Sequence, residues 1–431
     1  MNVTVTNART HGAIEAPTSK SAAHRLLMAA SLSEELSVLC VNGMNRDIEA
    51  TIACMSALGA KIERTAKTVS VRPIDRERLK EKIGAGETIE LPVSESGTTL
   101  RILLPVLGAL SVRARIVMEG RLPERPLAPL DLELTRHGMT IKKRGNELFV
   151  SGRLEGGAYT IPGDVSSQYI SGLLFALPLL SEDSTLEIVN AIESKNYIEM
   201  TERALHASSV TFEKEGRIYR IPGGQKYRLH GRMIVEGDYS GGAAILAAAA
   251  VSGESVTVTG LMPDTAQGDR EILAILRRFG AEVTEKDDAV TVRRRSLSGV
   301  TVDASQIPDL VPVIAAVGAL SDGTTTIKNA SRLRLKESDR LQTTREALSS
   351  IGAEITETED GLVICGKRTI AGGSAQSHHD HRIAMALAVA SFGAESPVTI
   401  GDAESVEKSY PAFFEALKKL GGKVDYEYDL R

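Results

Sequence analysis

Very apolar, helix-like runs return along the chain at intervals of roughly 70 residues. They begin near Ser21, Thr98, Ser167, Gly241, Pro308 and His381. Two of them, Leu173–Leu180 and Ile245–Val251, show how apolar these runs are. Both are far shorter than the ~20 apolar residues that a membrane-spanning helix needs. The pattern therefore predicts buried helices.

A second pattern interleaves with the first. A helical pattern ends in Gly or another small residue and then enters an alternating strand, which is the signature of a helix C-cap followed by a strand. The copies are Ala57–Ile62, Arg136–Ile141, Phe279–Val283, Ile351–Ile355 and Leu420–Val424, with a degenerate copy at Ala207–Val210. Because both patterns share one period, we expect six α/β units. Each unit has a strand, a buried helix, a strand, an amphipathic helix and a strand pair.

Six units of this size exceed what one core holds, so we expect two domains of three units each. We expect the chain to cross between the domains at Met233–Ser240 and a second time near Ser19 and Lys20. One domain then comprises residues 1–19 and 236–431, and the other comprises residues 20–235. A lone strand before Ser21 is expected to complete the discontinuous domain.

Composition removes several classes of function. The net charge of −5 gives no global basic field for nucleic acid or membranes. Aromatic residues are 4% and Trp is absent, which disfavours base-stacking surfaces. The cysteines are scattered, and the histidines at 378, 379 and 381 match no metal-site spacing. The N-terminus lacks the apolar segment of a signal peptide, so we expect a cytoplasmic protein.

Polar side chains gather where the buried helices begin, and many are cations. Those at or near helix starts or in constrained loops are Lys20, Arg25, Arg125, Lys336, Arg340, Arg382 and Lys408. Each has an ordinary explanation in helix capping or solvent exposure. Taken together in an acidic chain, they predict a site for a small anion bearing carboxylate and phosphate. No P-loop or dinucleotide-binding motif occurs, so neither ATP nor NAD is implied.

The stretch Arg332–Arg340 carries four cations in nine residues, just before a helix predicted from Leu341, Leu348 and Ile351. The spacing predicts Lys336 and Arg340 on one helix face, where like charges repel. Two explanations stay open: a solvated turn neutralised by its own acids, or an anion site. Asp309, at the first turn of a buried helix, is likewise either a partner of the helix dipole or a general base.

The motifs together resemble the 5-enolpyruvylshikimate-3-phosphate (EPSP) synthase family along the whole chain. They are Pro17–Arg25, Ser96–Arg101, Pro123–Pro126, Val165–Gln168, Arg334–Arg340, Asp380–Arg382 and Glu407–Lys408. The resemblance implies a two-domain inverse α/β barrel-like fold with six βαβαββ repeats, three per domain around buried helices. It implies an active site in the interdomain cleft and no metal or other cofactor. The implied reaction transfers the enolpyruvyl group of phosphoenolpyruvate to the 5-hydroxyl of shikimate 3-phosphate and releases phosphate.

The resemblance also implies roles for individual residues. The implied ligands of shikimate 3-phosphate are Ser21, Arg25, Ser166, Ser167, Gln168, Ser194, Tyr197, Asp309 and Lys336. Those of phosphoenolpyruvate are Lys20, Gly97, Arg125, Gln168, Arg340, Arg382 and Lys408. Asp309 resembles the base for the 5-hydroxyl and Glu337 the acid that protonates the methylene carbon. Lys20 competes with Glu337 for that proton transfer.

The chain departs from the family pattern at Thr18, Glu95 and Arg332, which leaves side-chain contacts at the edge of the site open. Gly97 keeps the small residue that the family associates with glyphosate, so we expect inhibition by glyphosate. We also expect a monomer. Two rival interpretations are a UDP-N-acetylglucosamine enolpyruvyl transferase and a non-enzymatic six-repeat DNA clamp. Against the first, the chain lacks the loop cysteine that this transferase carries before the region of Arg125. Against the second, the chain lacks the basic stripe that a DNA clamp needs.

Overall fold

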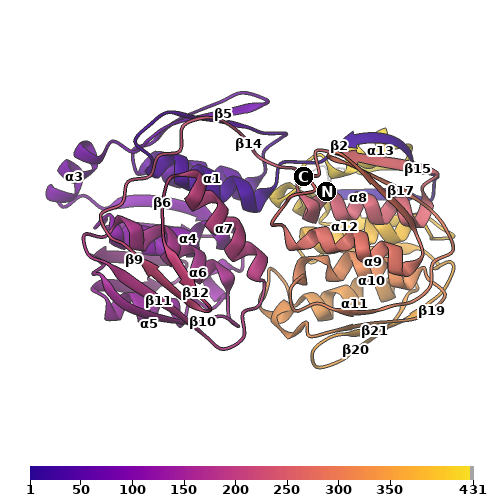
Figure 1. The fold of residues 1–431 in the computed structure, drawn as a ribbon. Helices are drawn as coiled ribbons and strands as arrows, with labels where there is room; N and C mark the ends of the chain where they lie inside the picture. Colours follow the sequence, from indigo (N-terminus) through magenta and orange to yellow (C-terminus); the bar gives the residue numbers. More distant parts are fainter. Residues whose placement is uncertain (428–431) are drawn as a thin grey trace. The chain divides into compact units, whose positions relative to one another are not determined.

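The computed structural model describes residues 1–427. The chain forms two compact units: unit 1 comprises Met1–Ser19 and the chain from Glu236 onward, and unit 2 comprises Lys20–Val235. Within the described residues the strands form six four-stranded sheets, three in each unit. The expected α/β class with repeating units is confirmed, and Figure 1 shows the elements of each unit.

Unit 2 contains three repeats of similar order. The first has α1 (Lys20–Leu32), β3 (Ser37–Cys40), α2 (Arg46–Ala57), β4 (Lys61–Arg64) and β5 (Thr68–Arg72), followed by α3 (Arg76–Gly84). The second has β6 (Ile89–Ser94), α4 (Gly97–Ala109), β7 (Ala114–Met118), the 3-10 helix η1 (Leu122–Glu124), α5 (Leu130–Arg136), β8 (Met139–Arg144) and β9 (Glu147–Gly152). The third has β10 (Gly157–Pro162), α6 (Ser167–Ala176), η2 (Leu177–Leu179), β11 (Ser184–Val189), α7 (Lys195–Ala207), β12 (Glu213–Glu215) and β13 (Ile218–Ile221), and β14 (Gly231–Ile234) ends the unit.

Unit 1 repeats this order three times after two N-terminal strands, β1 (Asn2–Thr6) and β2 (His11–Glu15). Its first repeat has α8 (Tyr239–Ser252), β15 (Ser255–Thr259), η3 (Gly268–Glu271), α9 (Ile272–Phe279), β16 (Glu282–Lys286) and β17 (Ala289–Arg293). The second has β18 (Thr301–Asp303), η4 (Pro308–Leu310), α10 (Val311–Ala319), β19 (Gly323–Lys328), η5 (Ser331–Leu335), α11 (Arg340–Ser350), β20 (Glu354–Glu357) and β21 (Leu362–Gly366). The third has β22 (Gly373–Gln376), α12 (His381–Ser391), β23 (Val398–Gly401), η6 (Ala403–Lys408), α13 (Phe413–Lys419) and β24 (Lys423–Glu427).

The two strands that precede α1 and α8 are exchanged between sheets. Strand β2 comes before α1 but pairs in parallel with β15 of unit 1, in the register His11 to Ser255. Strand β14 comes before α8 but pairs in parallel with β3 of unit 2, in the register Gly231 to Ser37. Strand β1 pairs with both β23 and β24. The expectation of a lone N-terminal strand is therefore wrong, because two strands lie there and each completes a different sheet of unit 1.

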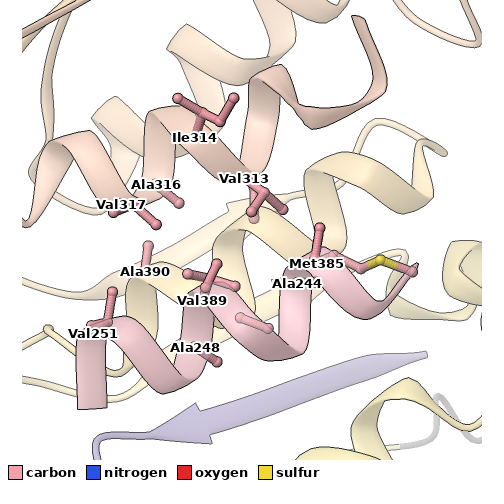
Figure 2. Close-up of a cluster of buried hydrophobic side chains, with 14 of the residues drawn as sticks. Ala244, Ala248, Val251, Val313, Ile314, Ala316, Val317, Met385, Val389 and Ala390 are labelled. Atoms are coloured by element: carbon pink, nitrogen blue, oxygen red, sulfur yellow. The ribbon is translucent and has the colours of Figure 1, made fainter. Parts of the chain in front are cut away.

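The core of unit 1 is built on three apolar helices, α8, α10 and α12. Every residue of α8 is buried, and Ala occupies much of its surface, so neighbouring helices approach closely. Figure 2 shows side chains of these helices pointing toward one another, among them Ala244 and Ala248 of α8, Val313 and Val317 of α10, and Val389 of α12. The corresponding helices α1, α4 and α6 lie in the core of unit 2. Within residues 1–427, every helix is too short or too polar to cross a membrane.

Candidate functional site

The buried helices of unit 1 begin close together. Asp238 caps α8 by accepting a hydrogen bond from the Ser240 N–H at 3.0 Å, and Asp380 caps α12 through the Arg382 N–H at 2.9 Å. The Arg382 guanidinium joins the two helix starts, since its Nη1 donates to the Ser240 carbonyl at 2.8 Å. The positive ends of these helix dipoles therefore face one region, which favours an anion there.

The stretch Arg332–Arg340 differs from the expectation of one continuous helix start. Residues Ser331–Leu335 form η5, Lys336 is extended, and α11 begins at Arg340. Asp339 sets this start because its carboxylate accepts from the Gln342 N–H at 3.2 Å. Lys336 and Arg340 consequently do not share a helix face, and the expected like-charge pair on one face is wrong.

Arg340 is nevertheless the centre of a buried ion cluster. Its side chain is 2% exposed, and its Nε lies 2.8 Å from Asp380 Oδ2. Its Nη1 donates to Asp309 Oδ1 and its Nη2 to Glu337 Oε2, both at 2.7 Å. Three carboxylates share one guanidinium, and together they raise its pKa against the effect of burial. Packing thus brings together residues from the starts of α10, α11 and α12.

Asp309 lies between two cations. Lys336 Nζ is 3.3 Å from the same Oδ1 that Arg340 contacts. Burial alone would raise the pKa of Asp309, but Lys336, Arg340 and Arg382 outweigh burial and hold the pKa of this carboxyl well below its usual value. The pKa of Lys336 is lowered, chiefly by burial and against the pull of Asp309. Without a bound anion, Asp309 is an ion-pair partner and a weak base.

Two further residues of unit 1 complete this region. Burial and the charge of Asp309 raise the pKa of Asp269 to about 7, so this carboxyl titrates near neutral pH. Lys408, at the end of η6, is 7% exposed, and η6 packs against α12. The sequence reasoning did not single out Asp269, because nothing local distinguishes it from an acid in a helical first turn. Asp380 belongs to the motif Asp380–Arg382, but the sequence predicted no binding or catalytic role for it.

Unit 2 carries a second group of polar side chains. Lys20, the first residue of α1, pairs with Asp47 at 2.9 Å, and both side chains are mostly buried. Ser21 is the second residue of α1 and so lies inside the helix. Asp47 was not anticipated from the sequence, although its position in the first turn of α2 is an ordinary one for an acid.

Arg25 is used mainly inside the protein. Its guanidinium makes four hydrogen bonds, to the Ser21 and Tyr197 carbonyls and to the Thr201 and Ser171 hydroxyls. An arginine has five N–H donors, so one remains for a ligand. Burial lowers the pKa of Arg25 to about 10. This residue ties α1 to α6 and α7, a role that its spacing in the sequence did not indicate.

The start of α4 lies against two arginines. A Cβ added at Gly97 would meet Arg125 Nη1 at 2.9 Å and Arg101 Nη1 at 3.2 Å. Gln168, in the first turn of α6, accepts from Arg101 Nη1 at 2.9 Å and donates to the Thr98 hydroxyl at 2.7 Å. The structure therefore brings Gly97, Arg125 and Gln168 together. It adds Arg101, which belongs to the motif Ser96–Arg101 but for which the sequence predicted no binding role.

The serines assigned to this unit lie at helix starts. Ser166 caps α6, since its hydroxyl accepts from the Gln168 N–H at 3.3 Å, and Ser167 is the first residue of that helix. Ser194 has a φ of 53° directly before α7, a left-handed conformation that is uncommon for serine. Tyr197 follows in the first turn of α7, with its ring 6.0 Å from the Arg25 guanidinium carbon.

Each unit thus presents hydrogen-bond donors and cations at helix starts. Carboxylates lie against these cations in both units, namely Asp309, Glu337 and Asp380 in unit 1 and Asp47 in unit 2. Such a set can bind phosphate and carboxylate groups and move protons. Among residues 1–427 no group of His, Cys, Asp and Glu side chains is arranged to hold a metal ion. His379 pairs with Asp402 and His378 with Glu346, so these two histidines turn toward different partners.

Comparisons with known proteins agree with this arrangement. Residues 5–417 match the family model of EPSP synthase (3-phosphoshikimate 1-carboxyvinyltransferase). The chain is 40% identical to the 3-phosphoshikimate 1-carboxyvinyltransferase of Clostridium kluyveri over 428 residues, covering 98% of each chain. It is also 40% identical to the enzyme of that name from Clostridium acetobutylicum, covering 97% of each. The solved EPSP synthase from Acinetobacter baumannii has the same fold, with a TM-score of 0.81 at 24% identity, covering 99% of this chain and all of that one.

Proposed function

Because the chain belongs to the EPSP synthase family and so transfers the enolpyruvyl group of phosphoenolpyruvate to shikimate 3-phosphate, we propose that the polar helix starts of its two units carry out this reaction together. The observation that carries the proposal is the hydrogen bond from Arg340 to Asp309 at 2.7 Å. In this bond, a residue proposed to bind an anionic substrate contacts the residue proposed as the general base.

The binding groups follow from charge and position. Lys20, Gly97, Arg125, Gln168, Arg340, Arg382 and Lys408 bind phosphoenolpyruvate in this proposal. Ser21, Arg25, Ser166, Ser167, Gln168, Ser194, Tyr197, Asp309 and Lys336 bind shikimate 3-phosphate. The buried guanidinium groups support it, since arginine binds phosphate and carboxylate with two parallel hydrogen bonds. Helix N–H groups add donors without a side-chain entropy cost.

The chemical steps need one acid and one base. Glu337 donates a proton to the methylene carbon of phosphoenolpyruvate, which leaves a cationic carbon. Asp309 accepts the proton of the 5-hydroxyl as its oxygen attacks that carbon. The adduct then loses the methyl proton and phosphate, which restores the double bond, and the surrounding cations stabilise the departing phosphate. Lys20 is the second candidate for the proton transfer.

Substrate binding can also activate the base. Arg340 and Lys336 now lower the pKa of Asp309. When the anionic groups of the substrates draw these cations away, the pKa of Asp309 rises toward the value of an effective base. In this proposal the ion pairs hold Asp309 as a weak base, and binding of both substrates makes it a stronger one.

Phosphate release from phosphoenolpyruvate tests the proposal. We expect release with shikimate 3-phosphate as acceptor and none with UDP-N-acetylglucosamine. Glu337→Gln should lower kcat by about 10²- to 10⁴-fold, the usual contribution of a general acid. Glu346→Gln, at a half-buried acid of α11, is the matched control and should keep wild-type kcat. A Glu337→Gln variant with normal kcat would remove Glu337 from the mechanism.

Three further expectations rest on the sequence and the family resemblance. Glyphosate competes with phosphoenolpyruvate at Gly97 and Arg125, the protein acts as a monomer, and it works in the cytoplasm. Inhibition kinetics at varied phosphoenolpyruvate concentration test the first, and a competitive pattern is expected. Analytical ultracentrifugation tests the second, for which a species of 46.1 kDa is expected.

A further inference from the structure

A hollow lined by arginines lies in unit 1, at the opposite ends of the buried helices from the residues described above. Its volume is about 890 Å³, within the usual range for small-molecule sites. The floor is formed by the last residues of α8 and by Leu320 and Gly393, which follow α10 and α12. Figure 2 shows Val251, one of the lining residues, at this end of α8.

Five arginines line this hollow, which we name the arginine hollow. They come from three separate parts of the sequence and are Arg9, Arg293, Arg294, Arg295 and Arg368. Of the acids within residues 1–427, Glu254 and Asp322 line it with them. The hollow therefore carries a local excess of cations, although the chain as a whole has a net charge of −5. Such a concave, cationic surface attracts small anions.

The ion pairs of the hollow do not neutralise it. Arg9 pairs with Glu254 at 3.0 Å, and Arg368 with Asp322 through two hydrogen bonds of 3.0 and 3.1 Å. Glu282, outside the lining, serves both Arg293 and Arg295. Three carboxylates thus face five guanidinium groups, which leaves an excess of two positive charges.

Arg294 is the cation without an ion pair. Its side chain is exposed, and among residues 1–427 no carboxylate lies within salt-bridge distance of it. Its backbone is fixed, because its N–H donates to the Gly253 carbonyl at 2.9 Å. A fixed backbone with an unpaired guanidinium suits a binding residue, since an incoming anion displaces no carboxylate from it.

The helix ends do not require these arginine side chains. The C-terminal ends of helices carry partial negative charge and often attract cations. Here backbone donors already serve them: Gly253 accepts from the Arg294 N–H, and Ala319, the last residue of α10, accepts from the Lys367 N–H at 2.8 Å. The helix ends therefore do not require the exposed Arg294 guanidinium, which is left for another partner.

Unit 2 offers an internal comparison at the corresponding ends of its helices. After α1, the Glu34 N–H donates to the Tyr227 carbonyl, just as after α8 the Glu254 N–H donates to the Thr10 carbonyl. Tyr227 and Thr10 thus occupy equivalent positions. The Tyr227 side chain is fully buried and its hydroxyl reaches the Phe175 carbonyl at 2.7 Å. Thr10 is much smaller and reaches only Ser252. Thr10 itself is buried beside Arg9 and Ser252, two residues that line the hollow.

From the open space, the excess charge and the unpaired Arg294, we propose that the arginine hollow binds a small molecule with two or more phosphate groups, at a site separate from the catalytic one. A phosphate group can bind several guanidinium groups at once, because its oxygens accept paired hydrogen bonds from them. Among residues 1–427 no aromatic side chain lines the hollow, so these residues offer no platform for a nucleotide base. The proposed ligand class is therefore a linear or compact polyphosphate ester or inorganic polyphosphate.

Isothermal titration calorimetry of the full chain with tripolyphosphate tests the proposal. Arg294→Ala should weaken binding about 10- to 100-fold, as expected for the loss of a charged hydrogen-bonding group. The matched control is Arg153→Ala, which removes one exposed positive charge from unit 2. Lys20→Ala controls for binding at the catalytic site. Both controls should keep wild-type affinity for tripolyphosphate.

Inorganic phosphate and citrate complete the series. Phosphate should bind more weakly than tripolyphosphate, because it reaches fewer arginines, and citrate should bind more weakly than tripolyphosphate if phosphate groups are recognised. Unchanged affinity in Arg294→Ala overturns the proposal. So does equal weakening in Arg153→Ala, which would indicate a non-specific charge effect. Loss of tripolyphosphate binding in Lys20→Ala but not in Arg294→Ala would mean that tripolyphosphate binds at the catalytic site instead.

Discussion

Arg340 donates a hydrogen bond to Asp309 at 2.7 Å across 31 positions of the sequence. The same guanidinium contacts Glu337 and Asp380, so the proposed acid, the proposed base and a helix cap are joined through one side chain. The protonation of each carboxylate therefore depends on the others and on any anion that draws Arg340 away.

Replacing the proposed base should affect turnover more than binding. We expect Asp309→Asn to lower kcat by about 10²- to 10⁴-fold, because asparagine keeps the shape but cannot accept the hydroxyl proton. Steady-state phosphate release measures the effect. Asp287→Asn, in the turn between β16 and β17 where φ is 54°, is the matched control and should be neutral. Wild-type turnover in Asp309→Asn would contradict the assignment.

The pKa of Asp309 should rise when substrate binds. Carbon-13 NMR of labelled aspartate carboxyls, titrated with and without shikimate 3-phosphate, measures this directly, with Asp309→Asn to assign the signal. We expect a pKa well below the ordinary value in the free protein and a higher one in the complex, because the phosphate competes for Lys336 and Arg340. An unchanged or lower pKa in the complex would contradict substrate-linked activation.

The ionisation of Asp309 should also contribute to the stability of the fold at acid pH. The pKa of Asp309 is lower in the folded protein than in the unfolded chain, so its carboxylate stabilises the fold above the unfolded-state value of about 4. This contribution is lost as pH falls toward the depressed folded value. Urea denaturation at several pH values should therefore show wild type losing stability relative to Asp309→Asn below about pH 4. A constant difference at all pH values would exclude the linkage.

The pair between Arg340 and Asp380 should be important for stability. Their side chains are 2% and 0% exposed, and removing one partner of a buried pair typically costs about 3–5 kcal/mol. Asp380→Asn retains the capping oxygen for α12, so it isolates the loss of charge. We expect a lower urea midpoint and a higher KM for phosphoenolpyruvate. Asp339→Asn, which alters a more exposed cap of α11, is the control and should cost about 1 kcal/mol or less.

Gly97 should be intolerant of a side chain for a steric reason. Gly97→Ala places a Cβ 2.9 Å from Arg125 Nη1, so that guanidinium must move. Because the contact is with the end of a flexible side chain, we expect the fold to persist while KM for phosphoenolpyruvate and the inhibition constant for glyphosate both rise. Gly84→Ala, where the added Cβ meets nothing within 4 Å, is the control and should change neither. Unaltered kinetics in Gly97→Ala would remove Arg125 from the proposed ligands.

The local pattern of the sequence determined the repeat and most helix starts. The apolar runs expected near Ser167 and His381 begin at those residues, because a buried helix needs an unbroken apolar surface and a polar cap, and both are written in neighbouring residues. The same local rules placed polar side chains at the helix starts. They failed at Lys336, where the cap at Asp339 delayed the helix.

Only the tertiary structure decided how these elements combine. The exchange of β2 and β14, the four internal hydrogen bonds of Arg25 and the sharing of Arg340 by three carboxylates all join residues far apart in the chain. Such contacts depend on how whole helices and sheets pack, and no short segment encodes them. The arginine hollow has the same origin, because its cations come from separate segments of the chain that meet at the ends of the buried helices.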